Sequence, residues 1–371
     1  MPVMRKNTEG AAGCLVPAVG AVLYYCVMNA QNIAIVGATG AVGVEILRVL
    51  ERRNFPVASL KLLASARSVG KTLEFKGKPY PVEELTAAAF KGIDIAFFSA
   101  GATRSREFVP AAKAAGAVVV DNSSAFRMDP ETPLVVPEVN AGDLAHHKGV
   151  IANPNCTAAI LATAVWPIHQ AAGIKRIVVS TYQSASGAGA AAMQELEDQV
   201  RQYGEGKELT RSVFPHQIAF NVFSHNTKVA ENGYNEEENK VVEEMRKMFH
   251  MPDLPIVPTC IRVPVLRAHS EAITLELEKP LSPAEARACS IWAAWFQASA
   301  SMQAAMQSRT RARRSFGSMA SSSQHLSGSA LVWSRYQRTR ASPTLVSVSK
   351  CGNRSRSSRT SAMRWKSQAE P

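Results

Sequence analysis

The sequence predicts an α/β protein in which an N-terminal Rossmann-like dinucleotide-binding domain precedes an α+β domain. A buried-type strand at 32–36 is followed by a glycine-rich turn and an amphipathic helix that ends near residue 53. More apolar strands follow helical or loop segments, as a parallel sheet requires, at 60–64, 93–99 and 117–121. Beyond residue 156, helical and alternating strand patterns are mixed, which indicates an α+β arrangement.

The glycine-rich turn is Gly37-Ala38-Thr39-Gly40-Ala41-Val42-Gly43. Glycines let a backbone approach a pyrophosphate closely, and the N-terminus of the next helix supplies positive partial charge. The GxxGxxG spacing is also compatible with a simple turn that packs a strand against a helix. The order of strand, turn and helix favours a dinucleotide site.

The end of the second strand indicates which dinucleotide would bind. An NAD site usually has an acid there for the ribose hydroxyls, yet no Asp or Glu lies between Glu51 and Glu74. Arg67 and Ser68 follow the strand instead. Because a guanidinium with hydroxyls suits a 2′-phosphate, we expect NADP, with a solvated arginine in a turn as the alternative.

Two other predicted strands end in polar residues. Ser99 ends the strand at 93–99, and the segment from Asn122 to Arg127 follows the strand at 117–121. Both positions are at the carboxyl ends of strands, where ligands bind in open α/β sheets.

Cys156 is expected at the N-terminus of a helix. A short strand at 149–152 stops at a Pro-containing turn, and a run of helix formers at 157–172 is closed by Gly173. Unpaired N–H groups and the helix dipole favour a thiolate there, and the thiolate is the nucleophilic form. The alternative is a small buried hydrophobe, as most free cysteines are.

Composition narrows the class of protein. No run of 18 apolar residues occurs, so no membrane-spanning helix is predicted. The six cysteines show neither CxxC nor zinc-site spacing, so no disulfide framework or metal site is indicated and a reducing cytoplasm is expected. The net charge of +12 belongs to residues 290–371, which hold 13 of the 42 Lys and Arg and one of the 30 acids. Residues 1–289 are neutral.

Residues 1–28 are expected to lie outside the fold. Their basic start and short apolar core are similar to a signal peptide, but Pro17 and Gly20 interrupt the apolar run and no small-residue cleavage site follows. Met28 stands directly before the first predicted strand, so the preceding residues are interpreted as upstream sequence.

The second half alternates strands and helices. Helices are predicted at 190–203 and 236–249, and strands at 175–182, 214–223, 257–266 and 272–278. Ser282-Pro283-Ala284-Glu285 is a capping box that starts one more helix.

Seven segments, in this order, resemble aspartate-β-semialdehyde dehydrogenases, and the resemblance covers about residues 29–288. One such motif is weak evidence, but seven in register are specific. The segments are 37–43, 122–127, 136–140, 153–157, 183–189, 237–240 and 261–270.

The resemblance implies a role for each matching residue. Cys156 would be the nucleophile that forms a thioacyl intermediate. His269 would be the general acid/base, titrating near the working pH, although a lone histidine can equally be a hydrogen-bonded structural residue. Arg262 would clamp the substrate carboxylate through two parallel hydrogen bonds.

Other matching residues would hold the rest of the substrate and the cofactor. Gln183 would orient the substrate, Glu237 would contact its amino group, and Asn155 would support the thiolate. Arg127 and Lys240 would hold the phosphate. The NADP contacts would be Gly37, Thr39, Gly40, Ala41, Val42, Arg67, Ser68, Ser99, Ser186 and Gly187.

The implied reaction is reductive dephosphorylation of L-4-aspartyl phosphate by NADPH to L-aspartate 4-semialdehyde, on the route to lysine, threonine and methionine. The family is dimeric, with the second domain forming the interface. The expected division is an NADP-binding domain at 29–155 and a catalytic and dimerisation domain at 156–289. Two alternatives stay open: a related acyl-phosphate reductase acting on N-acetylglutamyl phosphate or glyceraldehyde phosphate, and a nucleic-acid-binding protein acting through the basic tail. The tail lacks regularly interleaved aromatic residues, which counts against the second.

Residues 290–371 depart from the family pattern. Acids disappear, Ser and Arg dominate, and no C-terminal helix of the family type can be found. Low hydrophobic density with high charge favours an irregular or disordered tail. An abrupt change at Cys289 is typical of a shifted reading frame, so the second domain is expected to be incomplete.

Overall fold

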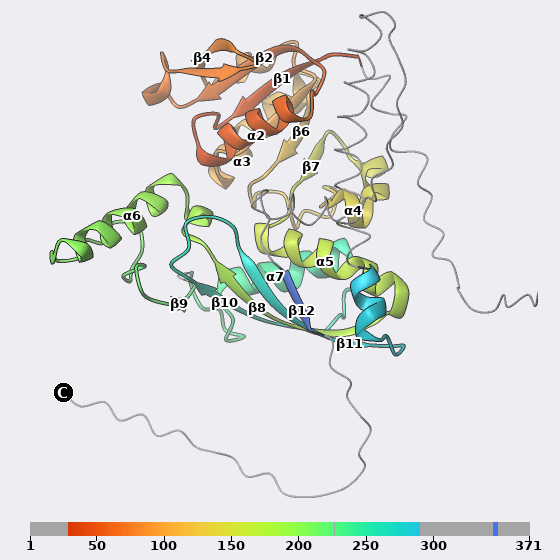
Figure 1. Ribbon diagram of the computed structural model, residues 1–371. Helices are drawn as coiled ribbons and strands as arrows, with labels where there is room; N and C mark the ends of the chain where they lie inside the picture. The colour runs from red at the N-terminus through yellow and green to blue at the C-terminus, as the bar shows by residue number, and fades with distance from the viewer. Residues whose placement is uncertain (1–28, 226, 290–343, 348–371) are drawn as a thin grey trace, which may run out of the picture.

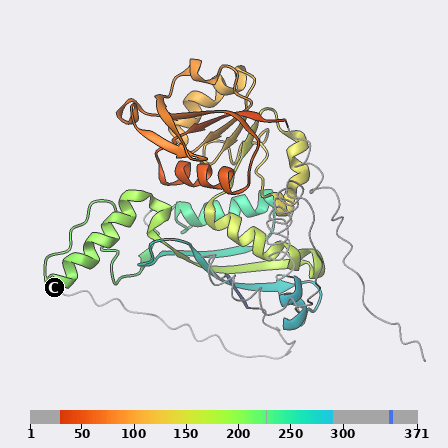
Figure 2. The same cartoon turned by 45° about the horizontal axis from the view of Figure 1, so that its top comes forward.

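The computed structural model describes residues 29–225 and 227–289, and the backbone of 344–347. These residues form a seven-stranded sheet of order β3-β4-β2-β1-β5-β6-β7 and a five-stranded sheet of order β12-β11-β8-β10-β9. The two sheets lie one above the other with helices between them (Figures 1 and 2). None of the helices in the described residues is long and apolar enough to cross a membrane.

The first sheet has a parallel core that confirms the four predicted strands and the short strand before Cys156. The predicted strands in this parallel core are β1 (Gln31–Val36), β2 (Val57–Ala64), β5 (Ile95–Phe98), β6 (Val118–Asp121) and β7 (Val150–Ala152). The antiparallel pair β3 (Thr72–Phe75) and β4 (Lys78–Glu84) was not predicted. Lys76 and Gly77 join them with φ values of 52° and 72°, the left-handed conformation that a two-residue hairpin turn requires.

Helices cover both faces of this sheet. Leu47 and Leu50 of α2 (Ala41–Arg52) pack with Ile33 and Ile35 of β1. On the other face, Val109 and Ala112 of α3 (Ala102–Ala114) pack with Ala34 and Val36 of β1. Because both faces of β1 are buried, its sequence is a continuous apolar run rather than an alternating one.

The chain reverses its strand order between β1 and β5, and the glycine-rich turn lies at that point. β1 pairs with β2 on one side and with β5 on the other. Gly37 after β1 is so close to Ser99 after β5 that a Cβ on Gly37 would lie 2.4 Å from the Ser99 carbonyl oxygen. Ligands of doubly wound sheets bind at such a switch point.

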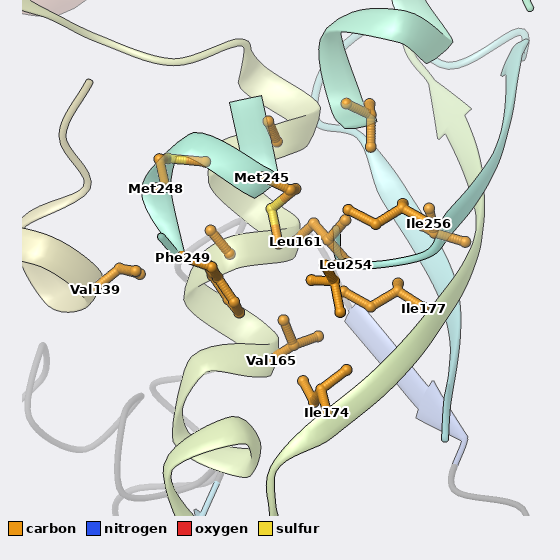
Figure 3. Packing of buried hydrophobic residues seen from close by; sticks show 14 of the residues in the cluster. Val139, Leu161, Val165, Ile174, Ile177, Met245, Met248, Phe249, Leu254 and Ile256 are labelled. Atoms are coloured by element: carbon orange, nitrogen blue, oxygen red, sulfur yellow. The ribbon is translucent and has the colours of Figure 1, made fainter. Parts of the chain in front are cut away.

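The second sheet is built around β8 (Ile174–Gln183), which is parallel to β10 (Ile256–Arg262) and antiparallel to β11 (Ser270–Leu277). β9 (Phe223–Ser224) and β12 (Thr344–Ser347) add to its two edges. Helices α5 (Cys156–Ala172) and α7 (Glu236–Met248) lie on one face, between this sheet and the first domain (Figures 1 and 2). Figure 3 shows the apolar cluster that α5 and α7 form with the sheet, around Leu161, Val165, Ile177, Met245 and Ile256.

The remaining elements are short apart from one helix. Helix α6 (Ala190–Gly204) extends away from the sheet, and residues 283–289 are helical after the Ser282–Glu285 capping box, as predicted. The short elements are α4 (Pro137–Asn140), η1 (Ala66–Ser68), η2 (Ala87–Phe90), η3 (Ala141–His146) and η4 (Ala185–Ala188).

The strand predicted at 214–223 is wrong except at its last residue. Its backbone is satisfied by side chains of α6 instead of a strand ladder: Glu195 accepts the N–H groups of residues 212–214, and Gln199 accepts those of Ile218 and Ala219. Phe214 and Ile218 are still buried, against Leu196 of α6. The apolar content reflected burial and not strand structure.

The strand predicted at 257–266 ends early, at Arg262. Pro264 cannot donate to a ladder, and residues 263–266 bond instead to the loop after β8. Ala185 N donates to Val265 O at 2.8 Å and Ser186 N to Leu266 O at 3.0 Å. The predictions for residues 1–28 and for the tail lie outside the described residues, except that the backbone of 344–347 forms β12.

Candidate active site

Asn155 caps helix α5 and is held from two directions by helix α7. Its Oδ1 accepts the N–H groups of Thr157 and Ala158. Its Nδ2 donates to Glu237 Oε1 at 2.9 Å, and its backbone N donates to Glu244 Oε2 at 2.5 Å. Glu237 and Glu244 are seven residues apart, two turns along one buried face of α7. The turn before α5 is therefore tightly fixed.

Cys156 is the first residue of α5, as predicted, and solvent reaches it. The prediction that this position favours the thiolate is wrong. Although the residue is accessible, the protein packed around the thiol disfavours a charge and raises the pKa of Cys156, with the Glu237 carboxylate adding to the effect. Hydrogen bonds with Thr157 and the charge of Arg127 oppose this rise without cancelling it.

Gln183 ends β8 and joins helix α5 to helix α7. Its Nε2 donates to Thr157 Oγ1 at 2.6 Å and to Glu237 Oε1 at 2.9 Å. Its buried Oε1 has no hydrogen-bond partner among the described residues. Burial opposes a charge on Glu237, but His225, the bonds from Asn155 and Gln183, and Lys240 outweigh it and lower the pKa of Glu237. A buried carboxylate and a free acceptor thus lie side by side.

Arg262 ends β10, in register with Gln183 on β8. It is 5 % exposed, and burial lowers the pKa of its guanidinium. Nη1 donates to Ser184 O at 3.1 Å and Nη2 to His225 Nε2 at 2.8 Å, while Nε has no partner within the described chain. A buried cation without a carboxylate in direct contact can bind an anionic ligand.

His269 precedes β11 and is bound to the loop after β8. Ser184 N donates to its Nδ1 at 3.0 Å, so Nδ1 is an acceptor and the neutral ring carries its proton on Nε2. Burial, and then the nearby Arg262, lower the pKa of His269 to about 4. The prediction that it titrates near neutral pH is therefore wrong. The neutral His269 ring therefore presents Nε2–H as a hydrogen-bond donor.

Gly187 lies against both of these side chains. A Cβ on Gly187 would be 3.0 Å from Arg262 Nη1 and 3.1 Å from His269 Nε2. Ser186 beside it shares a hydrogen bond of 2.9 Å with Ser184. The predicted residues Ser186, Gly187, Arg262 and His269 therefore share one small region.

Arg127 and Lys240 line a cavity of about 630 Å³ between α7 and residues 124–128. Arg127 is largely occupied by protein partners: it forms an ion pair with Glu244 at 3.0 Å and donates to the carbonyls of Asn122 and Asn153. Lys240 Nζ is 2.8 Å from Glu236 and 3.7 Å from Glu237. The structure brings these two predicted cations to one cavity but pairs both with carboxylates.

The predicted dinucleotide residues other than Ser186 and Gly187 lie at the carboxyl ends of β1, β2 and β5. Thr39 Oγ1 is 3.3 Å from Ser68 Oγ, and Arg67 lies in the same 3₁₀ turn as Ser68. Ala41 and Val42 open α2, whose first turn has no acid, and Gly40 is its N-cap. A Cβ on Gly43 would lie 2.3 Å from the Gly37 carbonyl, so the turn requires glycine. This close backbone turn fits a pyrophosphate.

Two residues of the site were missed from the sequence. Glu244 could have been found, because it follows Glu237 by two helical turns. His225 had no such signal: it lies in a segment without regular structure, and only the folded chain places it against Arg262.

Comparison with known proteins agrees with this geometry. Residues 32–147 match the family model of the semialdehyde dehydrogenase NAD-binding domain, and residues 165–295 match that of the semialdehyde dehydrogenase dimerisation domain. Aspartate-semialdehyde dehydrogenase of Synechocystis sp. is 55 % identical over 249 residues, which are 67 % of this chain and 74 % of that protein. The Aquifex aeolicus enzyme is 54 % identical over 260 residues, 69 % and 76 % of the two chains.

A solved structure shows the same relation. The crystal structure of aspartate-semialdehyde dehydrogenase II from Vibrio cholerae has a TM-score of 0.68 and 44 % sequence identity, over 70 % of this chain and 78 % of that one. The chain therefore belongs to the aspartate-semialdehyde dehydrogenase family.

Proposed function

We propose that this chain uses NADP and a cysteine thioester to interconvert L-4-aspartyl phosphate and L-aspartate 4-semialdehyde. The observation that carries the proposal is the neighbouring pair Arg262 and Gln183. Each has a buried polar atom, Arg262 Nε and Gln183 Oε1, without a partner in the described residues. A carboxylate would pair with the first and an ammonium group with the second, which is the chemistry of an α-amino acid.

The substrate would lie between these groups and Cys156. Arg262 would bind its carboxylate, Glu237 and Gln183 its amino group, and Arg127 and Lys240 its phosphate. A relative from Vibrio cholerae has been solved in complex with ASA, which supports a small-molecule substrate for this site.

The chain's own residues would first transfer the acyl group from phosphate to Cys156, and the thioester would then be reduced. Cys156 Sγ attacks the acyl carbon, the S–C bond forms, and the C–O bond to phosphate breaks; phosphate leaves with the electron pair and the thiol proton. Since the pKa of Cys156 is raised, deprotonation accompanies this attack instead of preceding it. His269 Nε2–H donates a hydrogen bond to the oxygen that becomes negative. A proton from solvent returns to Cys156 Sγ when the aldehyde is released.

The cofactor would be NADP, and the glycine turn fits its pyrophosphate. Gly37, Thr39, Gly40, Ala41 and Val42 would hold the diphosphate, and Arg67 with Ser68 the 2′-phosphate. Ser99 would contact the same cofactor from β5. Ser186 and Gly187 would contact the end nearest to Arg262 and His269. When bound, NADPH would supply the hydride that reduces the thioester.

The assembly and setting follow from the same assignment. A match to a family dimerisation domain supports a homodimer, with a dinucleotide domain at 29–155 and a catalytic domain at 156–289. The product aldehyde would serve lysine, threonine and methionine synthesis. A reducing cytoplasm would keep Cys156 as a free thiol.

The segment after residue 289 would limit activity. The family match ends at residue 295, and about a quarter of each relative is unmatched. We therefore expect weaker NADP binding and lower turnover than in a chimera that carries a relative's C-terminal segment from residue 290 onward. Equal NADP affinity in the two proteins would contradict this expectation.

Oxidation of aspartate semialdehyde by the full chain tests the proposed reaction. We expect NADPH to form only when NADP⁺ and phosphate or arsenate are both present, because the thioester needs an oxyanion acceptor. Formation at the same rate without phosphate or arsenate would exclude the thioester route.

A further inference from the structure

His225 connects the residue expected to bind the substrate carboxylate with the one expected to bind its amino group. It follows β9 and is 8 % exposed. Its Nε2 is 2.8 Å from Arg262 Nη2 and 4.0 Å from Glu237 Oε2. Its Nδ1 is 3.4 Å from Thr227 Oγ1.

The contact with Arg262 determines the protonation of His225. A guanidinium only donates, so Nε2 must be the acceptor and the proton must be on Nδ1, facing Thr227. Burial lowers the pKa of His225 to about 4, against the opposing effect of Glu237. His225 is therefore a neutral acceptor at physiological pH.

Two fixed acceptors determine the orientation of the Arg262 guanidinium. Ser184 O holds Nη1 and His225 Nε2 holds Nη2, while the Phe214 ring lies 5.7 Å from the guanidinium carbon. Nε is the nitrogen left without a partner in the described residues. Bidentate binding of a carboxylate depends on the plane of the guanidinium, so an acceptor that fixes this plane affects carboxylate affinity.

We propose that His225 is a positioning residue for carboxylate recognition: it accepts from Arg262 Nη2 and so holds the guanidinium plane in the orientation that a substrate carboxylate needs. The inference rests on the function proposed above. Because His225 would act through Arg262, its loss should weaken every ligand that has the carboxylate and leave an aldehyde without one unchanged.

Protection of Cys156 from alkylation tests this in the full chain without requiring turnover. Cys156 is treated with iodoacetamide, and its modification is followed on the Cys156 peptide by mass spectrometry. Three aldehydes compete: aspartate semialdehyde, succinic semialdehyde, which lacks only the amino group, and butanal, which lacks amino group and carboxylate. The variants are His225→Phe, which removes the acceptor, and His225→Gln, which can restore one. His216→Phe is the matched control, since His216 is exposed and its ring packs against that of Phe223.

We expect His225→Phe to raise the half-protecting concentration of both semialdehydes by the same factor, on the order of 10- to 100-fold, as for a lost hydrogen bond to a buried charge. Butanal should be unaffected, His225→Gln should recover most of the loss, and the control should match wild type. A loss below threefold, a similar loss for butanal, or no recovery in His225→Gln would overturn the inference. If His225→Phe does not fold, His225→Asn replaces it, because its amide is too short to reach Arg262. Failure of both semialdehydes to protect the wild-type chain would instead contradict the proposed function.

Discussion

Arg127 Nη1 and Glu244 Oε1 form a buried ion pair at 3.0 Å. It joins α7 to the segment after β6, and the second oxygen of Glu244 binds the backbone N–H of Asn155. Burial raises the pKa of Glu244, although Arg127 and the Asn155 N–H oppose the rise. The same carboxylate thus fixes a predicted phosphate-binding residue and the start of helix α5.

Glu244→Ala should destabilise the protein strongly. It leaves the buried guanidinium without its carboxylate, a change that costs about 3–5 kcal/mol. Urea unfolding of the full chain measures the loss, with exposed Glu243→Ala as the control, expected within about 0.5 kcal/mol of wild type. A loss below 1 kcal/mol in Glu244→Ala would show that the pair is not buried in solution.

Cys156→Ala should abolish turnover and leave NADP binding intact, because Cys156 is the proposed nucleophile. Since burial raises the pKa of this thiol, its alkylation by iodoacetamide should have a midpoint above the ordinary thiol value of about 8.5. The measurement is the rate of modification of the Cys156 peptide from pH 6 to pH 10. A midpoint below 8 would contradict the raised pKa and support the thiolate expected at the helix N-terminus.

Arg67→Glu should weaken NADP binding far more than NAD binding. The substitution places a negative charge where the 2′-phosphate is expected and also supplies an acid for ribose hydroxyls. Isothermal titration with both dinucleotides gives the ratio of the two Kd values. Equal losses for the two would contradict a 2′-phosphate site at the end of β2.

Glu271 should make stability fall as pH rises. Glu271 lies on β11 and is 2 % exposed, and neither carboxylate oxygen has a hydrogen-bond partner among the described residues. Burial raises the pKa of Glu271 to about 8. The pKa of Glu271 is near 4.5 in the unfolded chain, so between about pH 4.5 and pH 8 this carboxyl ionises in the unfolded chain but stays protonated in the native state. The free energy of unfolding therefore falls as the pH rises across this window, by at most about 5 kcal/mol.

Glu271→Gln removes this penalty. Its Tm should exceed that of wild type at pH 8, and the difference should close below about pH 4.5. Exposed Glu276→Gln on the same strand is the control, expected to show no such pH-dependent gain. A Tm difference that is constant from pH 4.5 to pH 8 would argue against a raised pKa.

Gly187→Ala should lower turnover while the protein stays folded. The new methyl group would lie about 3.0 Å from Arg262 Nη1 and from the His269 ring, closer than ordinary contacts. Gly204→Ala at the end of α6 is the matched control, because a Cβ there meets nothing within 4 Å. Steady-state turnover with unchanged thermal melts checks the prediction; equal turnover in the two variants would contradict it.

Local patterns predicted most of the fold because each reports burial directly. The β1 run is apolar throughout since both its faces are covered, and Gly173 ends α5 with a φ of 68°. The strand prediction for 214–223 failed because the backbone N–H groups of this segment are bound by side chains of α6, about 17 to 20 residues earlier in the chain. Local periodicity contains no information about such partners.

The site was predictable in its membership but not in its electrostatics. Cys156, Gln183, Glu237, Arg262 and His269 could be identified from motifs. The protonation of Cys156 and His269 depends on how deeply the folded chain covers them and on Arg262 beside His269, so residue type alone gave the wrong expectation. His225 and the Glu244 pair arise from contacts across 37 and 117 residues.

The placement of β8 between β10 and β11 has a consequence for insertions and deletions during evolution. Gln183 is in register with Arg262 on one side, and Tyr182 with Ser270, next to His269, on the other. Loss of one residue from β8 would turn Gln183 to the opposite face of the sheet. The exposed turn after α6, near Gly206, has no such constraint. Length variation among functional descendants should therefore accumulate after α6 and be absent from β8.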